Sequence, residues 1–274
     1  MESLSILGSG WLGLPLAKEL SNKYDVKLST TTDSKVDKLI YKNITSYLID
    51  IDNISNNIKS FLNSDILIIN IPSKNVDSFK KLIEKIKSSP IKKVIFISST
   101  SVYKDCNSYV KEEDTNCYSH SELLEIEDLF LKLENIKTTI LRFGGLIGYD
   151  RNLVKFFQNR TVSNSKAPLN LIHRDDCIEI IKQIIQKDIY GEIFNCCAST
   201  HPTKVEFYTY CADISNFEIP HFDDELYHYK IIDNEKLKKI LAYEYIHDDL
   251  LNIKFEQNEQ LHYEESDDKL FRRN

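Results

Sequence analysis

The sequence predicts an α/β protein built on a doubly wound, parallel sheet, with a small C-terminal α/β lobe. Two observations predict this class. Short apolar runs typical of strands alternate with amphipathic stripes typical of helices through the first hundred residues, and the first apolar run leads directly into three closely spaced glycines. Such alternation is typical of parallel sheets, because parallel strands need a crossover connection, which is usually a helix.

The opening stretch, residues 4–20, has the pattern of a strand, a glycine-rich turn and a helix. Gly8 is expected to make the tight turn, Gly10 to let backbone N–H groups approach a pyrophosphate, and Gly13 to let the helix pack on its strand. The predicted cofactor contacts in this loop are Gly8, Gly10, Trp11, Leu12 and Gly13. The sequence therefore predicts a dinucleotide-binding Rossmann site, with the phosphates at the helix N-terminus.

Further strands and helices follow the glycine loop in alternation. Strands are expected at 25–32, 47–51, 65–71 and 93–97, and helices at 34–39, 54–62 and around 79–86. The run 65–71 is the most continuous apolar stretch, so we expect a central strand buried on both faces. Cofactor contacts are expected at the carboxyl ends of the strands. These predicted contacts are Thr30, Thr31, Asp50, Ile51, Ile71, Pro72, Ser98 and Phe143.

The end of the second strand bears on the choice between NAD and NADP. Sites for NAD place an acidic side chain about twenty residues after the glycines, where it binds the ribose hydroxyls. Thr30 and Thr31 stand near that place without a carboxylate, Asp33 comes later, and Lys35 could donate to a 2′-phosphate. The sequence favours NADP as cofactor, with NAD second. In the alternative, Lys35 is a solvated lysine and Asp33 only caps the helix 34–39.

The fifth strand runs into Ser-Ser-Thr-Ser-Val-Tyr at 98–103. This segment, downstream of the glycine loop, resembles the extended short-chain dehydrogenase/reductase group, also called the NAD-dependent epimerase/dehydratase family. Segments 140–148, 170–176, 191–195 and 229–237 resemble later parts of the same family in the same order. The resemblance covers most of the chain up to about residue 245. It implies a Rossmann fold but does not indicate one substrate.

The resemblance also implies catalytic residues. In the family a hydroxyl residue polarises the substrate, a tyrosine is the general acid or base, and a lysine four residues later lowers the tyrosine pKa. Ser99 and Tyr118 take the first two places, and Glu122 stands in place of the lysine. Tyr118 lies at the mouth of a helix that is expected to begin near residue 119 or 121. A neighbouring carboxylate raises a phenol pKa. Three hypotheses stay open: Tyr118 acts as a neutral acid, Lys104 or Lys111 substitutes for the lysine, or the site binds a nucleotide without turnover.

The second half of the chain is expected to supply the substrate side. Residues 1–150 form the predicted dinucleotide-binding domain and 151–274 the substrate lobe, interleaved with the sheet near 165–200 and ending in a mobile tail from about 262. This tail is expected from its dense charge.

A helix is predicted over 177–186, with Asp175 or Asp176 as its N-cap. We expect His173 to be a structural histidine bonded to backbone, although it could instead face the substrate. The aromatic run within 205–211 is expected to lie in the core.

Composition and charge exclude several classes. The 42 acidic and 35 basic residues leave a formal charge of −7, which argues against a non-specific nucleic-acid binder. No leader-like start and no membrane-length apolar run are present, so we expect a cytoplasmic protein without a membrane partner. Six cysteines, at 106, 117, 177, 196, 197 and 211, show no zinc-site spacing, so we expect reduced, mostly buried thiols and no metal.

The leading functional hypothesis is an NAD(P)-dependent oxidoreductase acting on an unidentified small carbonyl or hydroxyl compound. The first alternative is a catalytically silent NADP-binding sensor or partner-binding module. The second is a nucleotide-sugar epimerase or dehydratase, which the missing lysine weakens because those reactions begin with substrate oxidation and need a base. A homodimer is an assembly state that the sequence leaves open.

Overall fold

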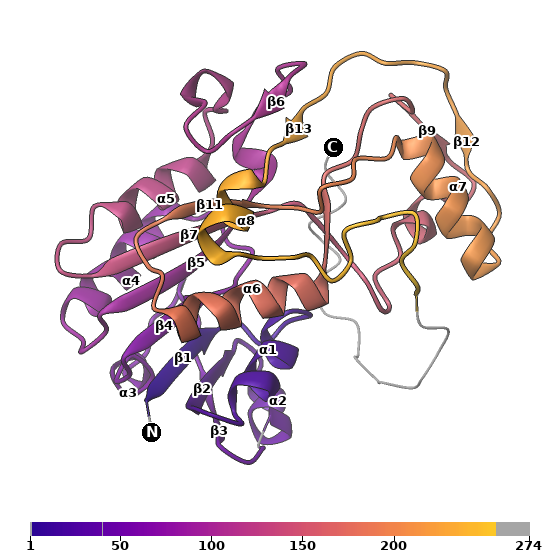
Figure 1. The fold of residues 1–274 in the computed structure, drawn as a ribbon. Helices are drawn as coiled ribbons and strands as arrows, with labels where there is room; N and C mark the ends of the chain where they lie inside the picture. The colour runs from indigo at the N-terminus through magenta and orange to yellow at the C-terminus, as the bar shows by residue number, and fades with distance from the viewer. Residues whose placement is uncertain (1, 40, 256–274) are drawn as a thin grey trace.

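The computed structural model describes residues 2–39 and 41–255. The centre of the fold is a seven-stranded sheet (Figure 1). The strand order is β11-β7-β5-β4-β1-β2-β3, and every neighbouring pair is parallel. The strands are β1 (Ser3–Leu7), β2 (Asp25–Thr30), β3 (Ile44–Leu48), β4 (Ile66–Ile69), β5 (Lys93–Ser99), β7 (Lys137–Phe143) and β11 (Ile193–Cys196). The predicted doubly wound, parallel sheet is confirmed.

Helices cover both faces of this sheet (Figure 1). They are α1 (Gly13–Leu20), α2 (Asp33–Val36), α3 (Asn57–Phe61), α4 (Val76–Lys87), α5 (Glu122–Leu131) and α6 (Arg174–Lys187). Helices α1 and α6 pack on one face, while α4 and α5 pack together on the other. In β4, Ile66 and Ile68 belong to the hydrophobic core between the sheet and helices α1 and α6. Leu67 and Ile69 belong to the core between the sheet and helices α4 and α5. This strand is therefore buried on both faces, as predicted, because successive side chains of a strand point to opposite sides.

The third strand differs from the prediction. It was expected at 47–51, but it spans Ile44–Leu48 because it pairs residue by residue with β2 and ends where that strand ends, at Thr30. Asp50 and Ile51 therefore lie just past the strand end. The pairing of two strands sets this boundary, and the apolar pattern of one strand does not contain it.

A smaller lobe lies beyond the carboxyl ends of the strands (Figure 1). Its paired strands are β8 (Gly145–Ile147) with β10 (Leu171–His173), and β9 (Thr161–Val162) with β12 (His221–Phe222). Its helices are α7 (Lys204–Ser215) and the 3₁₀ turn η4 (Leu153–Phe157). Phe207 and Tyr208 of α7 are buried in a separate core, so the prediction that this aromatic run is core is confirmed.

The two parts of the chain are interleaved. Strand β11 returns from the second half to the main sheet, and β13 (Ile231–Ile232) pairs with β6 (Tyr109–Val110) of the first half. Helix α8 (Glu235–Leu241) packs against β11. The remaining 3₁₀ turns are η1 (Asp37–Leu39), η2 (Thr100–Val102) and η3 (Thr115–Cys117). The predicted tail from about residue 262 lies outside the described residues.

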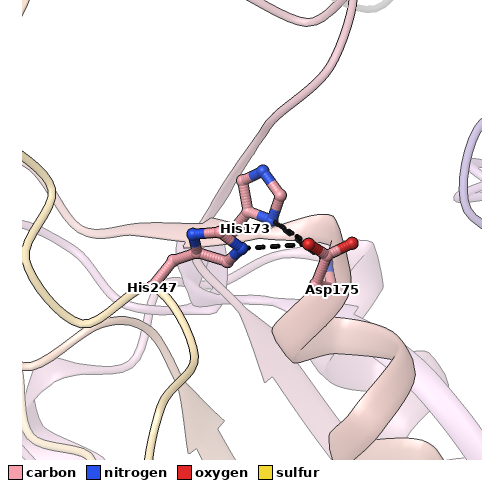
Figure 2. Close-up of side chains that lie close together, drawn as sticks. All are labelled: His173, Asp175 and His247. Carbon is pink, nitrogen blue, oxygen red and sulfur yellow. Dashed lines mark hydrogen bonds and ion pairs between the residues drawn. The ribbon is translucent and has the colours of Figure 1, made fainter. Parts of the chain in front are cut away.

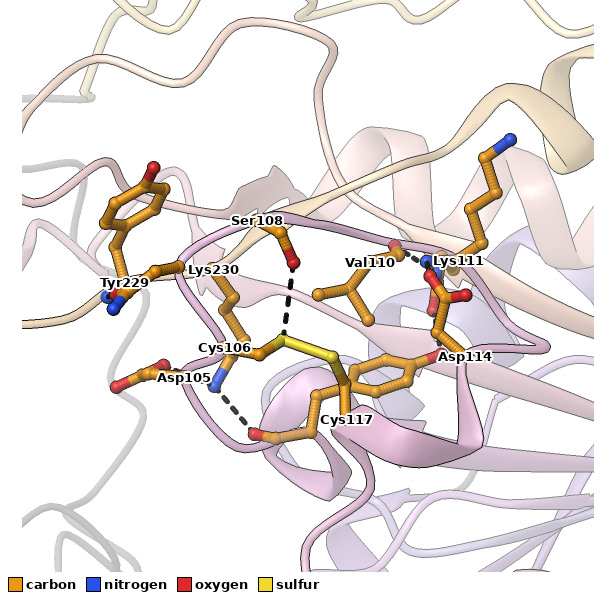
Figure 3. Close-up of a disulfide and its surroundings, with 12 residues drawn as sticks. Asp105, Cys106, Ser108, Val110, Lys111, Asp114, Cys117, Tyr229 and Lys230 are labelled. Carbon is orange, nitrogen blue, oxygen red and sulfur yellow. Dashed lines mark hydrogen bonds and ion pairs between the residues drawn. A yellow bond between two sulfur atoms is a disulfide. The ribbon is translucent and has the colours of Figure 1, made fainter.

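The expectation of six reduced thiols is wrong for two of them. Cys106 and Cys117 form a disulfide, with Cα atoms 6.0 Å apart, in the loop that follows β5 (Figure 3). The turn η3 carries Cys117 back to Cys106, a contact that follows from the fold of the loop and not from a sequence motif. The other cysteines are free and buried, as expected: Cys177, Cys196, Cys197 and Cys211.

Within the described part of the chain, no helix combines the length and the hydropathy that crossing a membrane requires.

A buried charge joins the end of the sheet to α5. Arg142 of β7 is 1% exposed, and its Nη2 lies 2.6 Å from Oε2 of Glu127 in α5, which is equally buried. The hydroxyl of Ser98 donates to the same carboxylate. Arg142 Nη1 donates to the Tyr103 hydroxyl over 2.5 Å, and this hydroxyl donates to Asn195 Oδ1 over 2.8 Å. The network thus ties β5, β7, β11 and α5 together.

We predict that Glu127→Ala lowers the free energy of unfolding by about 3–5 kcal/mol, because it leaves the Arg142 guanidinium buried without a counter-charge. Urea unfolding followed by circular dichroism measures the loss. The control is Glu125→Ala on the same helix, whose exposed pair with Lys80 spans 3.5 Å and is expected to change stability by less than about 1 kcal/mol. Equal losses in the two variants would contradict the prediction.

Candidate functional site

Two of the three loop glycines are required by the protein's own packing. Gly8 has a φ of +107°, and a Cβ there would stand 2.2 Å from the carbonyl oxygen of Asn70. A Cβ on Gly13 would stand 1.9 Å from the carbonyl oxygen of Gly8, where α1 begins against β1. The Gly8 N–H donates to Ser29 Oγ over 2.9 Å. The tight turn predicted at Gly8 and the close helix packing predicted at Gly13 are both present.

Gly10 is different, because no packing contact requires it. A Cβ built on this residue meets nothing within 4 Å, its φ lies outside the left-handed region, and the residue is exposed. The space over Gly10 opens at the start of α1, where N–H groups lack partners within the helix. An anion that approached the backbone there would profit from the missing side chain.

Two arginines flank the loop, and the sequence analysis missed both. The guanidinium carbons of Arg151 and Arg174 lie 4.6 and 4.8 Å from the centre of the Trp11 ring. Trp11 Nε1 donates to Asp150 Oδ1 over 2.7 Å, and Arg174 also stacks on Tyr149 at 3.8 Å. Both arginines come from the second half of the chain, so only the fold brings their charge to the glycine loop.

The predicted contacts at the end of β2 lie at one edge of the site. Thr30 is buried, and its Oγ1 accepts the N–H of Thr32 over 3.2 Å, whereas Thr31 is exposed. Lys35 is half-buried in α2, and Asp33 is the exposed first residue of that helix. The N-cap of α2 is Thr32, so the expectation that Asp33 caps this helix is wrong by one residue.

The predicted contacts after β3 and β4 follow the same strand ends. Asp50 Oδ1 accepts the N–H of Asp52 over 2.9 Å, and Ile51 is buried beside it. Ile71, followed by Pro72, lies against Gly8, because its Cγ2 would stand 2.9 Å from a Cβ there. The adjacent Asn70, which the sequence analysis did not single out, packs under both Gly8 and Gly13.

The two serines at the end of β5 have different surroundings. Ser98 is buried and bound to Glu127, so its hydroxyl belongs to the network in the core. Ser99 is half-buried at the strand end, opposite Phe143 of β7, and its Oγ accepts the N–H of Ser101 over 3.1 Å. A hydroxyl that accepts one hydrogen bond can still donate its proton, so Ser99 keeps the capacity to polarise a carbonyl.

Tyr118 faces the buried arginine. Its hydroxyl donates to the carbonyl oxygen of Glu112 over 2.5 Å and receives Arg142 Nη1 over 3.3 Å. The residue precedes α5, whose N-cap is Ser121, and Glu122 is the exposed first residue of that helix. The predicted helix start is confirmed, and no described hydrogen bond joins Tyr118 to Ser99.

A lysine that was not expected from the sequence, Lys230, lies beside the loop that follows β5. Lys230 Nζ donates to the carbonyl oxygen of Tyr103 over 2.8 Å and to Asp105 Oδ1 over 3.0 Å (Figure 3). The two lysines proposed as substitutes, Lys104 and Lys111, are exposed, and that hypothesis stays a prediction.

A groove of about 660 Å³ runs along α5. It is lined by Tyr118, His120, Ser121, Glu122, Leu124, Glu125, Glu127, Asp128, Leu131, Arg142 and Ile193. This groove unites the tyrosine candidate with the glutamate that replaces the family lysine, but no residue of the glycine loop belongs to it. Tyr118 therefore borders a space distinct from the loop.

His173 is a structural histidine, as expected. It is 4% exposed, it is the N-cap of α6, and its Nδ1 accepts the N–H of Asp175 over 3.2 Å. The prediction that Asp175 or Asp176 is the cap is therefore wrong, because both carboxylates bind groups elsewhere. Asp175 accepts from Tyr149, and its hydrogen bond with His247 raises the pKa of that histidine.

A search of protein-family models finds no match. Among characterised sequences, the chain is 32% identical over 276 residues to the protein YeeZ of Escherichia coli strain K12, covering 93% of this chain and 100% of YeeZ. The chain belongs to the YeeZ family.

The fold also occurs in solved structures. A conserved protein of unknown function from Silicibacter pomeroyi has a TM-score of 0.76 at 14% identity, covering 92% of this chain and 96% of its own. A UDP-glucuronic acid 4-epimerase from Bacillus cereus, solved with NAD and a fluorinated UDP-glucuronic acid, has a TM-score of 0.75 at 20% identity, with coverages of 91% and 96%. This YeeZ relative thus has the fold of the extended short-chain dehydrogenase/reductase group, as the resemblance implied.

Proposed function

We propose that this protein is an oxidoreductase that binds NADP, or NAD second, at the glycine loop and acts on a small carbonyl or hydroxyl compound. The observation that carries the proposal is Gly10. Gly8 and Gly13 are explained by packing, whereas Gly10 borders open space at the start of α1, and no packing contact requires a glycine there. Backbone approach to a pyrophosphate supplies that requirement.

The charges around the loop support the same ligand. Arg151 and Arg174 add positive charge beside Trp11, where the phosphates of a dinucleotide would lie. Proteins of this fold have been solved with NAD, as the epimerase from Bacillus cereus illustrates. The preference for NADP rests on Thr30 and Thr31 in place of a carboxylate and on Lys35 nearby in α2.

Ser99 is our candidate for the catalytic hydroxyl, since it stays half-buried at the strand end while Ser98 is drawn into the core. Tyr118 is the candidate acid, and its bond to the Glu112 carbonyl must break before its proton reaches a substrate. This constraint favours a second candidate function, a silent NADP-binding module. The placement of Tyr118 in a separate groove supports that alternative.

We also propose a location and an assembly state for this protein. The proposed location is the cytoplasm. The disulfide between Cys106 and Cys117 counts against it, because reducing compartments disfavour such bonds. A homodimer remains the assembly state to compare with the monomer by light scattering.

We predict that Gly10→Ala keeps the melting temperature of the free protein but weakens NADPH binding by roughly tenfold or more, because the added methyl occupies the space of the pyrophosphate. Thermal shift during an NADPH titration measures both quantities. The contrasting variant, Gly13→Ala, is expected to lower the melting temperature of the free protein, since its Cβ meets the Gly8 carbonyl at 1.9 Å. If wild-type protein shows no shift with millimolar NADPH or NADH, the proposed function fails.

We predict that Lys35→Ala weakens NADPH binding by about tenfold and leaves NADH binding nearly unchanged, because a charge-assisted hydrogen bond to a 2′-phosphate contributes about 1.5–3 kcal/mol. Isothermal titration with both dinucleotides gives the ratio. Lys42→Ala is the control, as this exposed lysine precedes β3 outside the site. Equal losses for both dinucleotides would remove Lys35 from the 2′-phosphate contact.

We predict that Ser99→Ala lowers kcat/KM by about a hundredfold while NADPH binding is kept, because the variant removes one donor to the developing oxyanion. NADPH oxidation against a panel of aldehydes and ketones measures it. Tyr118→Phe, run in parallel, tests the acid: unchanged activity excludes Tyr118 from proton transfer. Binding without oxidation across the panel would favour the silent module.

A further inference from the structure

Three metal-ligating side chains converge where α6 begins (Figure 2). Their donor atoms are Nδ1 of His173, Oδ2 of Asp175 and Nε2 of His247, and all three lie within 4.8 Å of one another. Oδ2 of Asp175 is 3.3 Å from the first nitrogen and 2.9 Å from the second. Figure 2 shows both imidazoles directed at one carboxylate oxygen. Among the described residues, no other group of three histidine, cysteine or acidic side chains converges in this way.

The two imidazoles and the carboxylate are held in place by their neighbours. The ring of His173 lies against Gly148, where a Cβ would stand 2.2 Å from Nε2. The rings of His173 and His247 have centroids 3.8 Å apart. The Tyr149 hydroxyl donates to Oδ1 of Asp175 over 2.7 Å, which leaves Oδ2 turned toward the histidines. The donors are therefore positioned before any ion arrives.

The segment that carries His247 is anchored by a second carboxylate. Asp176 is fully buried, and it accepts the N–H groups of Ile246 and His247 over 2.7 and 3.1 Å and the hydroxyl of Tyr243 over 2.7 Å. These bonds bring a residue 72 positions beyond Asp175 back to the start of α6. Adjacent aspartates thus have separate tasks: one faces the histidines, and the other fixes the chain that supplies one of them.

The cluster contains an electrostatic conflict that a cation would relieve. Nδ1 of His173 accepts the backbone N–H of Asp175, so that nitrogen carries a lone pair and cannot also donate to Oδ2. The lone pair and the anionic oxygen are nevertheless only 3.3 Å apart. A metal ion between the donors accepts the Nδ1 lone pair in place of the Asp175 N–H and turns this repulsion into attraction.

We propose that His173, Asp175 and His247 bind one divalent transition-metal ion of the Zn²⁺ class. Tetrahedral sites with bonds of about 2.0–2.1 Å hold their donors about 3.3 Å apart, close to the separations of 3.3 and 2.9 Å found here. Two imidazoles and one carboxylate suit Zn²⁺, Co²⁺ or Ni²⁺ better than Ca²⁺ or Mg²⁺, which prefer oxygen ligands. Three protein ligands leave the fourth position to solvent or substrate.

The surroundings fit a site of moderate affinity. Tyr149 is the hydrogen-bonding neighbour that orients the carboxylate, as outer partners of metal ligands commonly do. The Arg174 guanidinium carbon lies 3.8 Å from the centre of the Tyr149 ring and adds a repulsive charge. We therefore expect a dissociation constant of about 1 μM.

Titration of untagged, chelator-treated full-length protein with Zn²⁺ tests the proposal. Isothermal calorimetry should give one ion per chain, and Co²⁺ should produce visible absorption bands typical of tetrahedral coordination. His247→Gln and Asp175→Asn, which preserve side-chain shape, should each weaken Zn²⁺ binding by at least about tenfold. His221→Gln, at an exposed histidine of β12, should bind like the wild type.

Thermal unfolding keeps the test decisive if a variant is destabilised. Zn²⁺ should raise the melting temperature of the wild type and of His221→Gln but not that of folded His247→Gln. The proposal is overturned if the wild type binds no Zn²⁺ at 100 μM. Equal binding by His247→Gln and wild type would overturn it as well. NADPH titration of the metal-free protein then tests the dinucleotide site separately.

Discussion

The buried guanidinium of Arg142 is the constraint on which this end of the molecule depends. A charge with 1% exposure is tolerable only with a counter-charge and with its donors satisfied, and Glu127, Tyr103 and Tyr118 meet that need. Those partners come from α5 and from the loop after β5. One buried charge therefore fixes the position of the loop that carries Tyr118.

The buried Arg142 also affects Tyr118, the tyrosine of the motif in which Glu122 replaces the lysine. Tyr118 contributes its hydroxyl to the Arg142 network, because this hydroxyl accepts from Arg142 Nη1 and donates to the backbone carbonyl oxygen of Glu112. Glu122 is an exposed residue in the first turn of α5, a place that suits a carboxylate because the helix N-terminus is positive. The glutamate is thus locally favourable in the position where the family resemblance leads to the expectation of a lysine.

In the glycine loop, packing within the protein requires some of the glycines, and the proposed ligand explains another. Gly8 and Gly13 allow β1 and α1 to approach each other, and Asn70 fills the space beneath both. Gly10 borders open space, and Arg151 and Arg174 bring positive charge to it from the second half of the chain. The second half thus adds charge to the loop as well as forming the smaller lobe.

The sequence by itself determined the parallel sheet, the turn at Gly8, the strand 65–71 buried on both faces and the start of α5, because periodicity and glycine geometry are local properties. It also carried the family resemblance. Only the tertiary structure decided which of Ser98 and Ser99 stays at the strand end, where β3 begins, and that two cysteines pair.

The tertiary structure also decided that His173 caps α6 and meets His247, 72 positions beyond Asp175. Such contacts between distant residues depend on which strands pair with each other and on how a distant segment is anchored. Local patterns of charge and hydropathy do not contain that information, because a contact between distant residues follows from the packing of the whole chain.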